Sequence, residues 1–322
     1  AQVLKHIREL AFMGFIEVVR NLPQILRNFK LIKKQIQAFD PDIVLFIDYP
    51  GFNLRMAEWT HKNGIRNAYY IAPQVWAWKE NRIHKMRKYI DRLYVILPFE
   101  KKYFESHKIN TKYVGHPLLE GIPEEPLHGR QKQHDGITLA LLPGSRKQEI
   151  QKMLPVMLQS LKSFPEVRAI IAGAPNIECR FYERWTQNNP RISLMENKTY
   201  DLLAKAYYAL VTSGTATLET ALFKVPQIVL YKGNWLSYRI AKSFVKVKYI
   251  SLVNLILDRP VLPELIQAKV TPAKIAKQLQ ELMTPEKTQQ QLDAFQNLRI
   301  LLDEGGASGL VVSDIRNSLR SA

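Results

Sequence analysis

The chain has 322 residues, 46% of them hydrophobic and 23% charged, which is the composition of a globular protein of about two domains and excludes intrinsic disorder. With 14 Gly, 18 Pro and one Cys it is neither collagen-like nor disulfide-linked, and the lone Cys179 favours a reducing compartment. Lys and Arg outnumber Asp and Glu by 46 to 29. The net charge of +17 favours an anionic partner: a nucleic acid, an acidic membrane surface or a phosphorylated substrate.

The first half of the sequence predicts alternating helices and strands. An amphipathic helix is predicted over residues 28–39, where apolar side chains recur at helical spacing: Phe29, Ile32, Ile36 and Phe39. The continuous apolar run at 43–47 predicts a strand buried on both faces. A helix over 54–63 and strands over 68–71 and 93–97 follow. This alternation indicates a parallel sheet with helices on both faces.

The second half repeats the pattern after a polar segment, residues 121–136, which predicts a linker. Strands are predicted at four places: 137–142, 167–172, 208–212 and 227–231. The last stretch, 292–318, has helical spacing interrupted at 305–309, and it is long enough to pack back on the first half. We therefore expect an α/β fold of two doubly wound domains, divided as follows: 1–128, 129–306 and a terminal helix at 307–322.

Ligands of parallel sheets bind beyond the carboxyl ends of the strands, so the breaks after the predicted strands are the candidate sites. Asp48 follows the first strand, where a carboxylate that faces a crevice can act as a general base. The structural alternative for Asp48 is to cap the next helix or to fix a Pro-Gly turn.

The turn at 142–146 (LPGSR) joins a strand to a helix. Gly144 permits close approach of the backbone, the amides around Ser145 favour anions, and Arg146 can hold a phosphate with two hydrogen bonds. The P-loop pattern is absent, and no Gly-x-Gly-x-x-Gly occurs in the sequence. An ordinary tight turn followed by a surface Arg remains the alternative.

A second small, hydroxylated turn lies between strand and helix at 212–219 (TSGTATLE). Ser213, Gly214 and Thr215 form a second candidate anion site, and Glu219 lies along the helix, where it can accept hydrogen bonds from two ribose hydroxyls. Helix capping is the alternative. Two such turns in one half favour a nucleotide diphosphate.

Three further polar residues are weaker candidates: Asn254, Glu264 and His116. We expect Asn254 and Glu264 in irregular segments and His116 near the domain junction, and residues of these types are more often structural than functional. No His, Cys or carboxylate pair has metal-ligand spacing, and no Gly-x-Ser-x-Gly elbow supports a serine hydrolase.

Two regions combine apolar or aromatic residues with cations, at 11–34 and 235–248. Such a combination suits the interface of an anionic membrane, and a helix is expected at the second region. The alternative is a core-facing stripe with solvated lysines. No apolar run reaches the roughly 18 residues that span a bilayer.

Eight motifs follow one another along nearly the whole chain: MGFIEV (13–18), IDYPGFN (47–53), PQVWAW (73–78), LPFE (97–100), VGHP (114–117), LPGSR (142–146), SGTATLE (213–219) and EGGAS (304–308). In identity and order they resemble the motifs of the lipid-A-disaccharide synthase family. The combination of Trp-Ala-Trp with Leu-Pro-Gly-Ser-Arg is specific to this pattern.

The resemblance implies a GT-B fold, with the nucleotide held mainly by the second domain, and an inverting, metal-independent glycosyltransferase without a cofactor. The implied donor is UDP-2,3-diacylglucosamine and the implied acceptor is 2,3-diacylglucosamine 1-phosphate (lipid X). The products are the β-1,6-linked disaccharide 1-phosphate of lipid A biosynthesis and UDP. A cytoplasmic enzyme, peripheral to the inner face of the inner membrane, is expected; a homodimer is left open.

The resemblance also assigns roles by position. Asp48 deprotonates the acceptor 6-hydroxyl, and Arg146 stabilises the departing diphosphate. The residues implied for the UDP-sugar are Gly144, Ser145, Ser213, Gly214, Thr215, Glu219, Asn254 and Glu264. The residues implied for the acceptor or the cleft are Asn53, Trp76 and His116.

Two departures from the family pattern are evident. Family members begin with a strand and a Gly-Glu-x-Ser-Gly-Asp type loop upstream of the 13–18 motif, so the first domain is expected to be incomplete at its N-terminus and part of the active site to be missing. Gly51 stands where many members have Asp. Three alternatives remain: another GT-B UDP-sugar enzyme (an epimerase or transferase), an inactive fragment that still binds UDP, and a basic nucleic-acid-binding protein. The last lacks any helix-turn-helix, RNP or zinc-finger signature.

Overall fold

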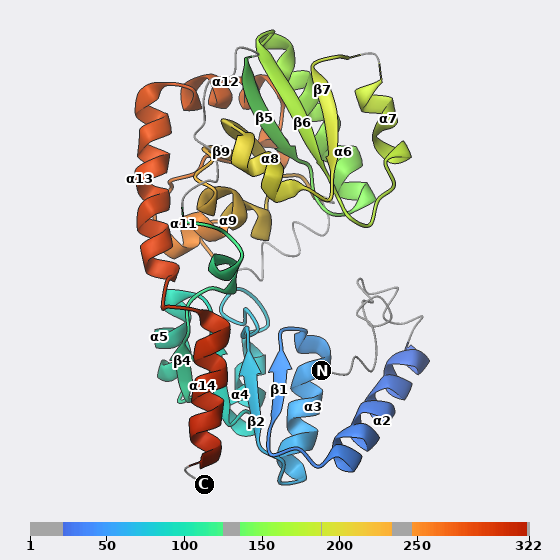
Figure 1. Cartoon of the computed structure of the whole chain (residues 1–322), viewed down its shortest axis with the longest axis vertical. Coiled ribbons are helices and arrows are strands. Elements are labelled where there is room, and N and C mark those ends of the chain that lie inside the picture. The colour runs from blue at the N-terminus through green and yellow to red at the C-terminus, as the bar shows by residue number, and fades with distance from the viewer. Residues whose placement is uncertain (1–21, 125–135, 188, 234–246, 321–322) are drawn as a thin grey trace.

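The computed structural model describes residues 22–124, 136–187, 189–233 and 247–320, which form two parallel β-sheets. The expected doubly wound α/β architecture is therefore confirmed (Figure 1). The 13–18 motif, most of the expected linker and the stretch 235–244 lie outside the described residues.

The first sheet has four strands in the order β1-β2-β3-β4. Its strands are β1 (Val44–Ile47), β2 (Asn67–Tyr70), β3 (Arg92–Val95) and β4 (Thr111–Tyr113). The helices that alternate with them are α2 (Leu22–Phe39), α3 (Pro50–Lys62), α4 (Ile83–Tyr89) and α5 (Pro98–Ser106), with short 3-10 turns η2 (Glu80–Arg82) and η3 (Pro117–Glu120). With α14, described below, they form the first lobe.

The second sheet has six strands in the order β10-β9-β8-β5-β6-β7. Its strands are β5 (Ile137–Leu142), β6 (Val167–Gly173), β7 (Ile192–Glu196), β8 (Tyr208–Thr212), β9 (Gln227–Tyr231) and β10 (Glu264–Ile266). Its helices are α6 (Lys147–Ser160), α7 (Arg180–Thr186), α8 (Thr199–Lys205), α9 (Thr215–Leu222), α11 (Leu252–Leu257), α12 (Pro272–Leu282) and α13 (Pro285–Leu302), with 3-10 turns η4 (Leu161–Ser163) and η5 (Gln267–Lys269). These elements form the second lobe.

Local sequence explains where many of these helices begin. Pro occupies the first turn of four helices, where its missing N–H is not needed: Pro50, Pro98, Pro272 and Pro285. The helix expected from residue 54 therefore starts at Pro50. The strands expected at 137–142, 208–212 and 227–231 are confirmed at those bounds.

The strand β1 differs from its prediction. Among the described strands it lies at the edge of the sheet, and of its four residues only Phe46 is buried, whereas Leu45 is 36% and Ile47 53% exposed. The prediction of burial on both faces was wrong because an apolar run cannot report whether a second strand or helix covers it. Phe39 is likewise 80% exposed, although Phe29, on the same helix, packs on the core of the first lobe.

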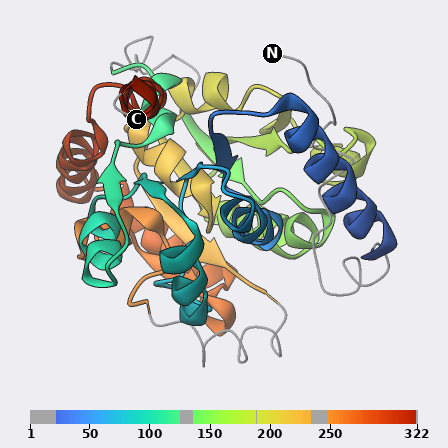
Figure 2. The ribbon, with the colours of Figure 1, turned by 90° about the horizontal axis from the view of Figure 1, so that it is seen from below.

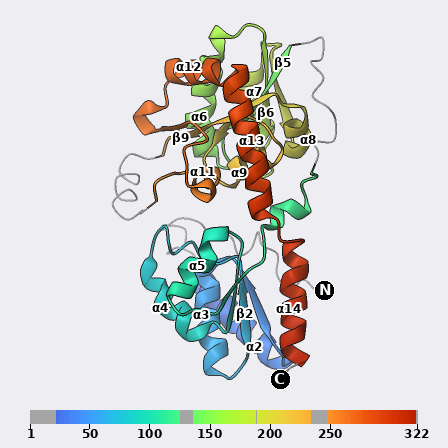
Figure 3. The ribbon, with the colours of Figure 1, turned by 90° about the vertical axis from the view of Figure 1, so that its left-hand side faces the viewer.

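The stretch 292–318 belongs to two helices, since α13 ends at Leu302 and α14 (Ala307–Arg320) begins after a short non-helical segment. Figure 3 shows α13 along the second lobe and α14 along the first. Figure 2 shows α14 on the opposite face of the first sheet from α3. Ala307 and Val311 pack there against Tyr70 and Tyr94, so the C-terminus returns to the first lobe as expected.

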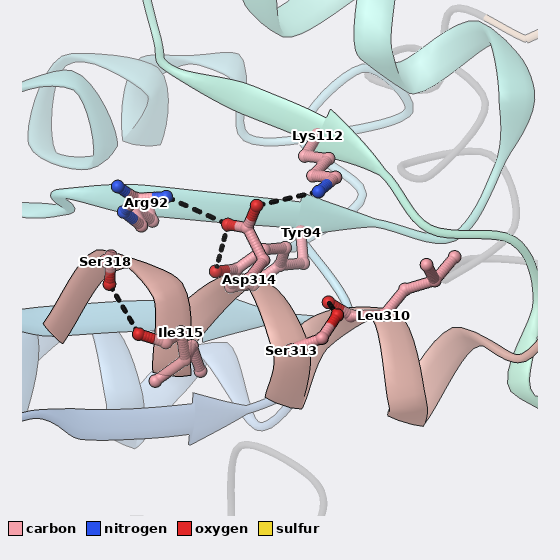
Figure 4. A network of polar contacts seen from close by, with 8 residues as sticks. All are labelled: Arg92, Tyr94, Lys112, Leu310, Ser313, Asp314, Ile315 and Ser318. Carbon is pink, nitrogen blue, oxygen red and sulfur yellow. Dashed lines mark hydrogen bonds and ion pairs between the residues drawn. The ribbon is translucent and has the colours of Figure 1, made fainter. Parts of the chain in front are cut away.

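A carboxylate fixes α14 on the sheet (Figure 4). Asp314 accepts hydrogen bonds from Arg92 Nη1 at 2.9 Å, Tyr94 Oη at 2.8 Å and Lys112 Nζ at 2.7 Å. These donors come from β3 and β4, so one side chain of α14 joins two strands of the first lobe.

Candidate active site

The strand order of the second sheet brings two predicted turns together. Leu142, at the carboxyl end of β5, pairs with Val211 of β8. The chain leaves β5 toward β6 and leaves β8 toward β9, in opposite directions, and ligands of such sheets bind where the order reverses. The turns 143–146 and 213–215 therefore adjoin at this point.

The carboxyl ends of strands in the first lobe face helices of the second lobe. In Figure 1, β1 and β2 run toward the second lobe, and α9 and α11 lie on the side of the second lobe that faces the first. The carboxyl ends of β1 and β2 and the helices α9 and α11 thus lie on the sides by which the two lobes face each other (Figure 1).

A carboxylate that the sequence analysis missed organises the turn before α6. Arg146 Nη1 donates to Glu149 Oε1 at 2.7 Å, and the amide of Ser145 donates to Glu149 Oε2 at 3.2 Å. Gly144 has φ +117°, and a Cβ there would lie 2.8 Å from Glu149 Oε2. Glu149 is the third residue of α6, a position from which carboxylates commonly reach back to the helix start.

The turn before α9 has a free helix start. Gly214 precedes the helix with φ +153° and provides no side-chain cap, and both Gly214 and Thr215 are exposed. Ser213 Oγ donates to the carbonyl of Ile250 at 3.0 Å. Exposed amides at a helix N-terminus attract anions, so this turn and the neighbouring Arg146 suit a diphosphate.

Glu219 is held by a tyrosine that the sequence analysis also missed. Tyr200 Oη donates to Glu219 Oε1 at 3.0 Å, and burial followed by the Glu219 charge raises the pKa of Tyr200 to about 12. Among the described residues, no hydrogen bond is made to the second carboxylate oxygen of Glu219. Glu219 is therefore fixed in place rather than a freely solvated helix charge.

Asn254 and Glu264 do not lie in irregular segments, so that prediction was wrong: Asn254 is in α11 and Glu264 begins β10. Asn254 is 1% exposed. Its side-chain Oδ1 accepts a hydrogen bond from the Leu262 amide at 2.8 Å, and its Nδ2 donates to the Leu262 carbonyl at 3.0 Å. Glu264 accepts from Asn254 Nδ2 at 2.9 Å and from the amides of Ile250 and Ser251 at 3.0 Å. Both side chains thus brace the segment that contacts the 213–215 turn.

Asp48 sits in a tightly held turn at the end of β1. Asp48 and Tyr49 have φ of 45° and 46°, a left-handed conformation that non-glycine residues rarely adopt. Asn53 Nδ2 donates to the carbonyls of Ile47 and Asp48 at 3.0 and 2.7 Å, and Tyr69 Oη also donates to the Asp48 carbonyl. The backbone is fixed, while the Asp48 carboxylate is exposed and makes no hydrogen bond or ion pair with the described residues.

Trp76 is anchored within the first lobe. Its Nε1 donates to Glu100 Oε1 at 2.9 Å, and its ring meets Phe99 edge-on with centroids 4.9 Å apart. Glu100 is 1% exposed and also accepts from the amide of Leu97 at 3.1 Å. Burial raises the pKa of Glu100 to about 7. Residues 97–100 belong to a motif noted in the sequence, but the partnership with Trp76 depends on the fold.

His116 lies where the lobes join. Its Nδ1 accepts from the amide of Leu118 at 3.2 Å, its own amide donates to the carbonyl of Leu302 at 3.0 Å, and burial lowers its pKa to about 4. Gly115 has φ +78°, and a Cβ there would lie 2.9 Å from the same Leu302 carbonyl. A neutral His116 therefore packs the junction between β4 and the end of α13.

The described residues contain neither an evident metal-binding cluster nor a membrane-spanning helix. No group of three or more His, Cys, Asp or Glu side chains is arranged among them to hold a metal ion. No helix among them has the length and apolar character of a membrane span.

Comparison with known proteins identifies relatives along the whole chain. A family model described as lipid-A-disaccharide synthetase matches residues 1–306. A lipid-A-disaccharide synthase of Syntrophus aciditrophicus is 38% identical over 316 residues, which cover 93% of this chain and 82% of the relative.

Solved structures share the two-lobed arrangement at low sequence identity. A Neisseria meningitidis UDP-GlcNAc 2-epimerase bound to UDP-GlcNAc has a TM-score of 0.62 at 12% identity, over 95% of this chain and 83% of its own. A glycosyltransferase of kitacinnamycin has a TM-score of 0.63 at 11% identity, with the same coverage of both chains. These similarities confirm the expected GT-B fold.

Proposed function

The chain belongs to the lipid-A-disaccharide synthase family, and on this premise we propose how its two lobes divide the reaction between them. It is a glycosyltransferase of lipid A disaccharide synthesis that uses a UDP-sugar. We propose UDP-2,3-diacylglucosamine as the donor and 2,3-diacylglucosamine 1-phosphate as the acceptor. The transfer inverts the anomeric carbon and requires no metal.

The second lobe holds the donor. Arg146 and the amides of the 213–215 turn contact the diphosphate, Gly144 and Ser145 line its path, and Glu219 accepts hydrogen bonds from the ribose. The observation that carries this assignment is the adjacency of the β5 and β8 ends, which unites two anion-binding turns from distant parts of the sequence.

The first lobe supplies the base. Asp48 takes the proton of the acceptor 6-hydroxyl as that oxygen attacks C1 of the donor sugar. The bond between C1 and the diphosphate oxygen breaks, and UDP leaves with its negative charge stabilised by Arg146. One base and one stabilised leaving group complete an inverting transfer without a covalent intermediate.

The remaining predicted site residues act by positioning. Asn53 fixes the Asp48 turn, and Asn254 with Glu264 braces the segment next to Ser213. Trp76 shapes the acceptor side of the cleft from its anchor on Glu100, and His116 packs the junction between the lobes.

A peripheral association with an anionic membrane is part of the proposal. The helix α2 leaves Leu22 and Leu26 46% and 56% exposed, beside the exposed cations Arg27 and Lys30. Apolar side chains flanked by cations suit the interface of an anionic bilayer. Such a position would bring the site to its acylated substrates at the cytoplasmic face.

The test is a transfer assay with labelled UDP-2,3-diacylglucosamine, with and without 2,3-diacylglucosamine 1-phosphate. We expect the disaccharide 1-phosphate and UDP only when both substrates are present, and no product from unacylated UDP-GlcNAc. Asp48→Asn should abolish turnover, whereas Asp42→Asn, at the exposed other end of the strand, should retain it. Conversion of UDP-GlcNAc to another UDP-hexosamine without an acceptor would instead indicate an epimerase.

A further inference from the structure

Two cations share one tryptophan ring in the segment that follows β2. Lys79 Nζ lies 4.5 Å from the centroid of the Trp78 ring, and Arg82 Cζ lies 5.6 Å from the same centroid. Trp78 is 47% exposed, so its face is accessible. The backbone of Lys79 has φ +56°, a left-handed conformation that fixes the turn from which these side chains project.

Among the residues that the structure describes, no carboxylate neutralises the charges of this pair. Neither Lys79 nor Arg82 forms an ion pair with a described carboxylate, whereas the nearby Lys85 pairs with Glu58 at 3.0 Å. Partial burial lowers the pKa of both groups, and the charge of Arg82 lowers that of Lys79 further. The charge of Glu80, which lies between them in sequence, acts instead on Tyr103.

Tyr69 connects Arg82 with the proposed base. The Tyr69 hydroxyl donates to the Asp48 carbonyl. Burial raises the pKa of Tyr69, the Asp48 charge raises it further, and the Arg82 charge opposes this, so the carboxylate and the guanidinium both lie near this hydroxyl. Arg82 and the Asp48 turn thus both lie near Tyr69 in the first lobe, whereas the turns assigned to UDP belong to the second lobe.

We propose that Lys79 and Arg82, supported by Trp78, bind the phosphomonoester of the acceptor sugar. Two adjacent, partly desolvated cations without a carboxylate partner are well suited to a doubly charged phosphate, since each can form a charge-assisted hydrogen bond. This proposal rests on the proposed function, because it needs an acceptor that carries a phosphate. It explains how the enzyme distinguishes a phosphorylated acceptor from its donor, whose phosphates bind the other lobe.

The experiment compares Lys79→Gln, Arg82→Gln and their double variant with the parent protein, in micelles of a non-ionic detergent that offer no anionic surface. We expect each single change to raise the KM for the phosphorylated acceptor about 10-fold or more, on the scale of one lost charge-assisted hydrogen bond, while the KM for the UDP-sugar stays unchanged. With an acceptor that lacks the phosphate, the parent and the double variant should turn over equally slowly.

The matched control is Lys85→Gln, which removes a nearby cation that Glu58 already neutralises at 3.0 Å. It should leave both KM values unchanged, and equal thermal unfolding midpoints should show that all variants are folded. An unchanged acceptor KM in the active double variant overturns this proposal alone, whereas absence of transfer by the parent protein overturns the proposed function.

A parallel arm measures co-sedimentation with phosphatidylglycerol vesicles. If the double variant loses vesicle binding but still prefers the phosphorylated acceptor in micelles, the cations serve a lipid surface and the acceptor assignment is wrong. Retained vesicle binding together with a lost preference for the phosphorylated acceptor supports the proposal.

Discussion

The guanidinium of Arg146 lies 2.7 Å from the carboxylate of Glu149, at the start of the helix that follows β5. The pair is largely accessible, with 58% and 34% of the two side chains exposed. Glu149 therefore holds Arg146 in the position where the donor diphosphate is proposed to bind, at little cost or benefit to folding.

Arg146→Ala should reduce kcat by about 100- to 1,000-fold, because it removes a charged donor to the leaving diphosphate, worth roughly 3–4 kcal/mol in the transition state. The thermal unfolding midpoint should barely change, since exposed ion pairs contribute about 0–1 kcal/mol. Steady-state kinetics and thermal unfolding of the same preparation test both statements. Near-normal UDP release by the variant would refute the role of Arg146.

Asn53→Ala should lower kcat about 10-fold with little change in either KM, because two hydrogen bonds that fix the Asp48 turn are lost while substrate contacts remain. Asn63→Ala is the matched control, since Asn63 also donates to a backbone carbonyl, that of Trp59 at 2.8 Å, but at the far end of α3. Equal effects of the two substitutions on kcat would contradict the positioning role.

Asp314→Ala should destabilise the protein by about 2–3 kcal/mol, because it leaves three donors of β3 and β4 without their shared acceptor. Urea unfolding measures the loss. Asp293→Ala, which removes an exposed carboxylate of α13 bonded to Gln289, should cost less than about 1 kcal/mol. A loss for Asp314→Ala no larger than this control would show that α14 does not depend on the carboxylate.

Glu100 predicts a pH dependence of stability. Its folded pKa of about 7 exceeds the ordinary 4.5, so between these values the folded protein retains a proton that the unfolded chain releases. The contribution of Glu100 to the unfolding free energy should therefore fall as pH rises from about 4.5 to 7, by up to about 3 kcal/mol at 1.36 kcal/mol per pKa unit. Burial lowers the pKa of His116 from 6.5 to about 4, so the His116 contribution has the opposite slope over much of the same pH range, and a variant of Glu100 is needed to separate the two.

Glu100→Gln isolates this contribution, because the amide oxygen can still accept from Trp76 but does not titrate. The difference in unfolding free energy between parent and variant, measured in urea at pH 5, 6, 7 and 8, should shift in favour of the variant as pH rises. A difference that stays constant over this range would rule out titration of Glu100 in the folded protein.

Local sequence determined the elements that carry the proposed site residues. The apolar runs before Asp48, Arg146 and Ser213 predicted strands, and the turn residues after them predicted where ligands would bind, because strand ends depend on nearby residues alone. The motifs then indicated the family, which the comparisons confirmed.

Only the tertiary structure decided which of these residues meet. The pairing of Leu142 with Val211, the bond from Trp76 to Glu100 and the three donors on Asp314 each join residues far apart in the chain. Hydrophobic spacing tells which face of an element is apolar but not what will cover it, since that depends on packing between distant segments. For this reason the sequence alone could not predict that β1 is exposed or that the Asn254 side chain is buried and hydrogen-bonded.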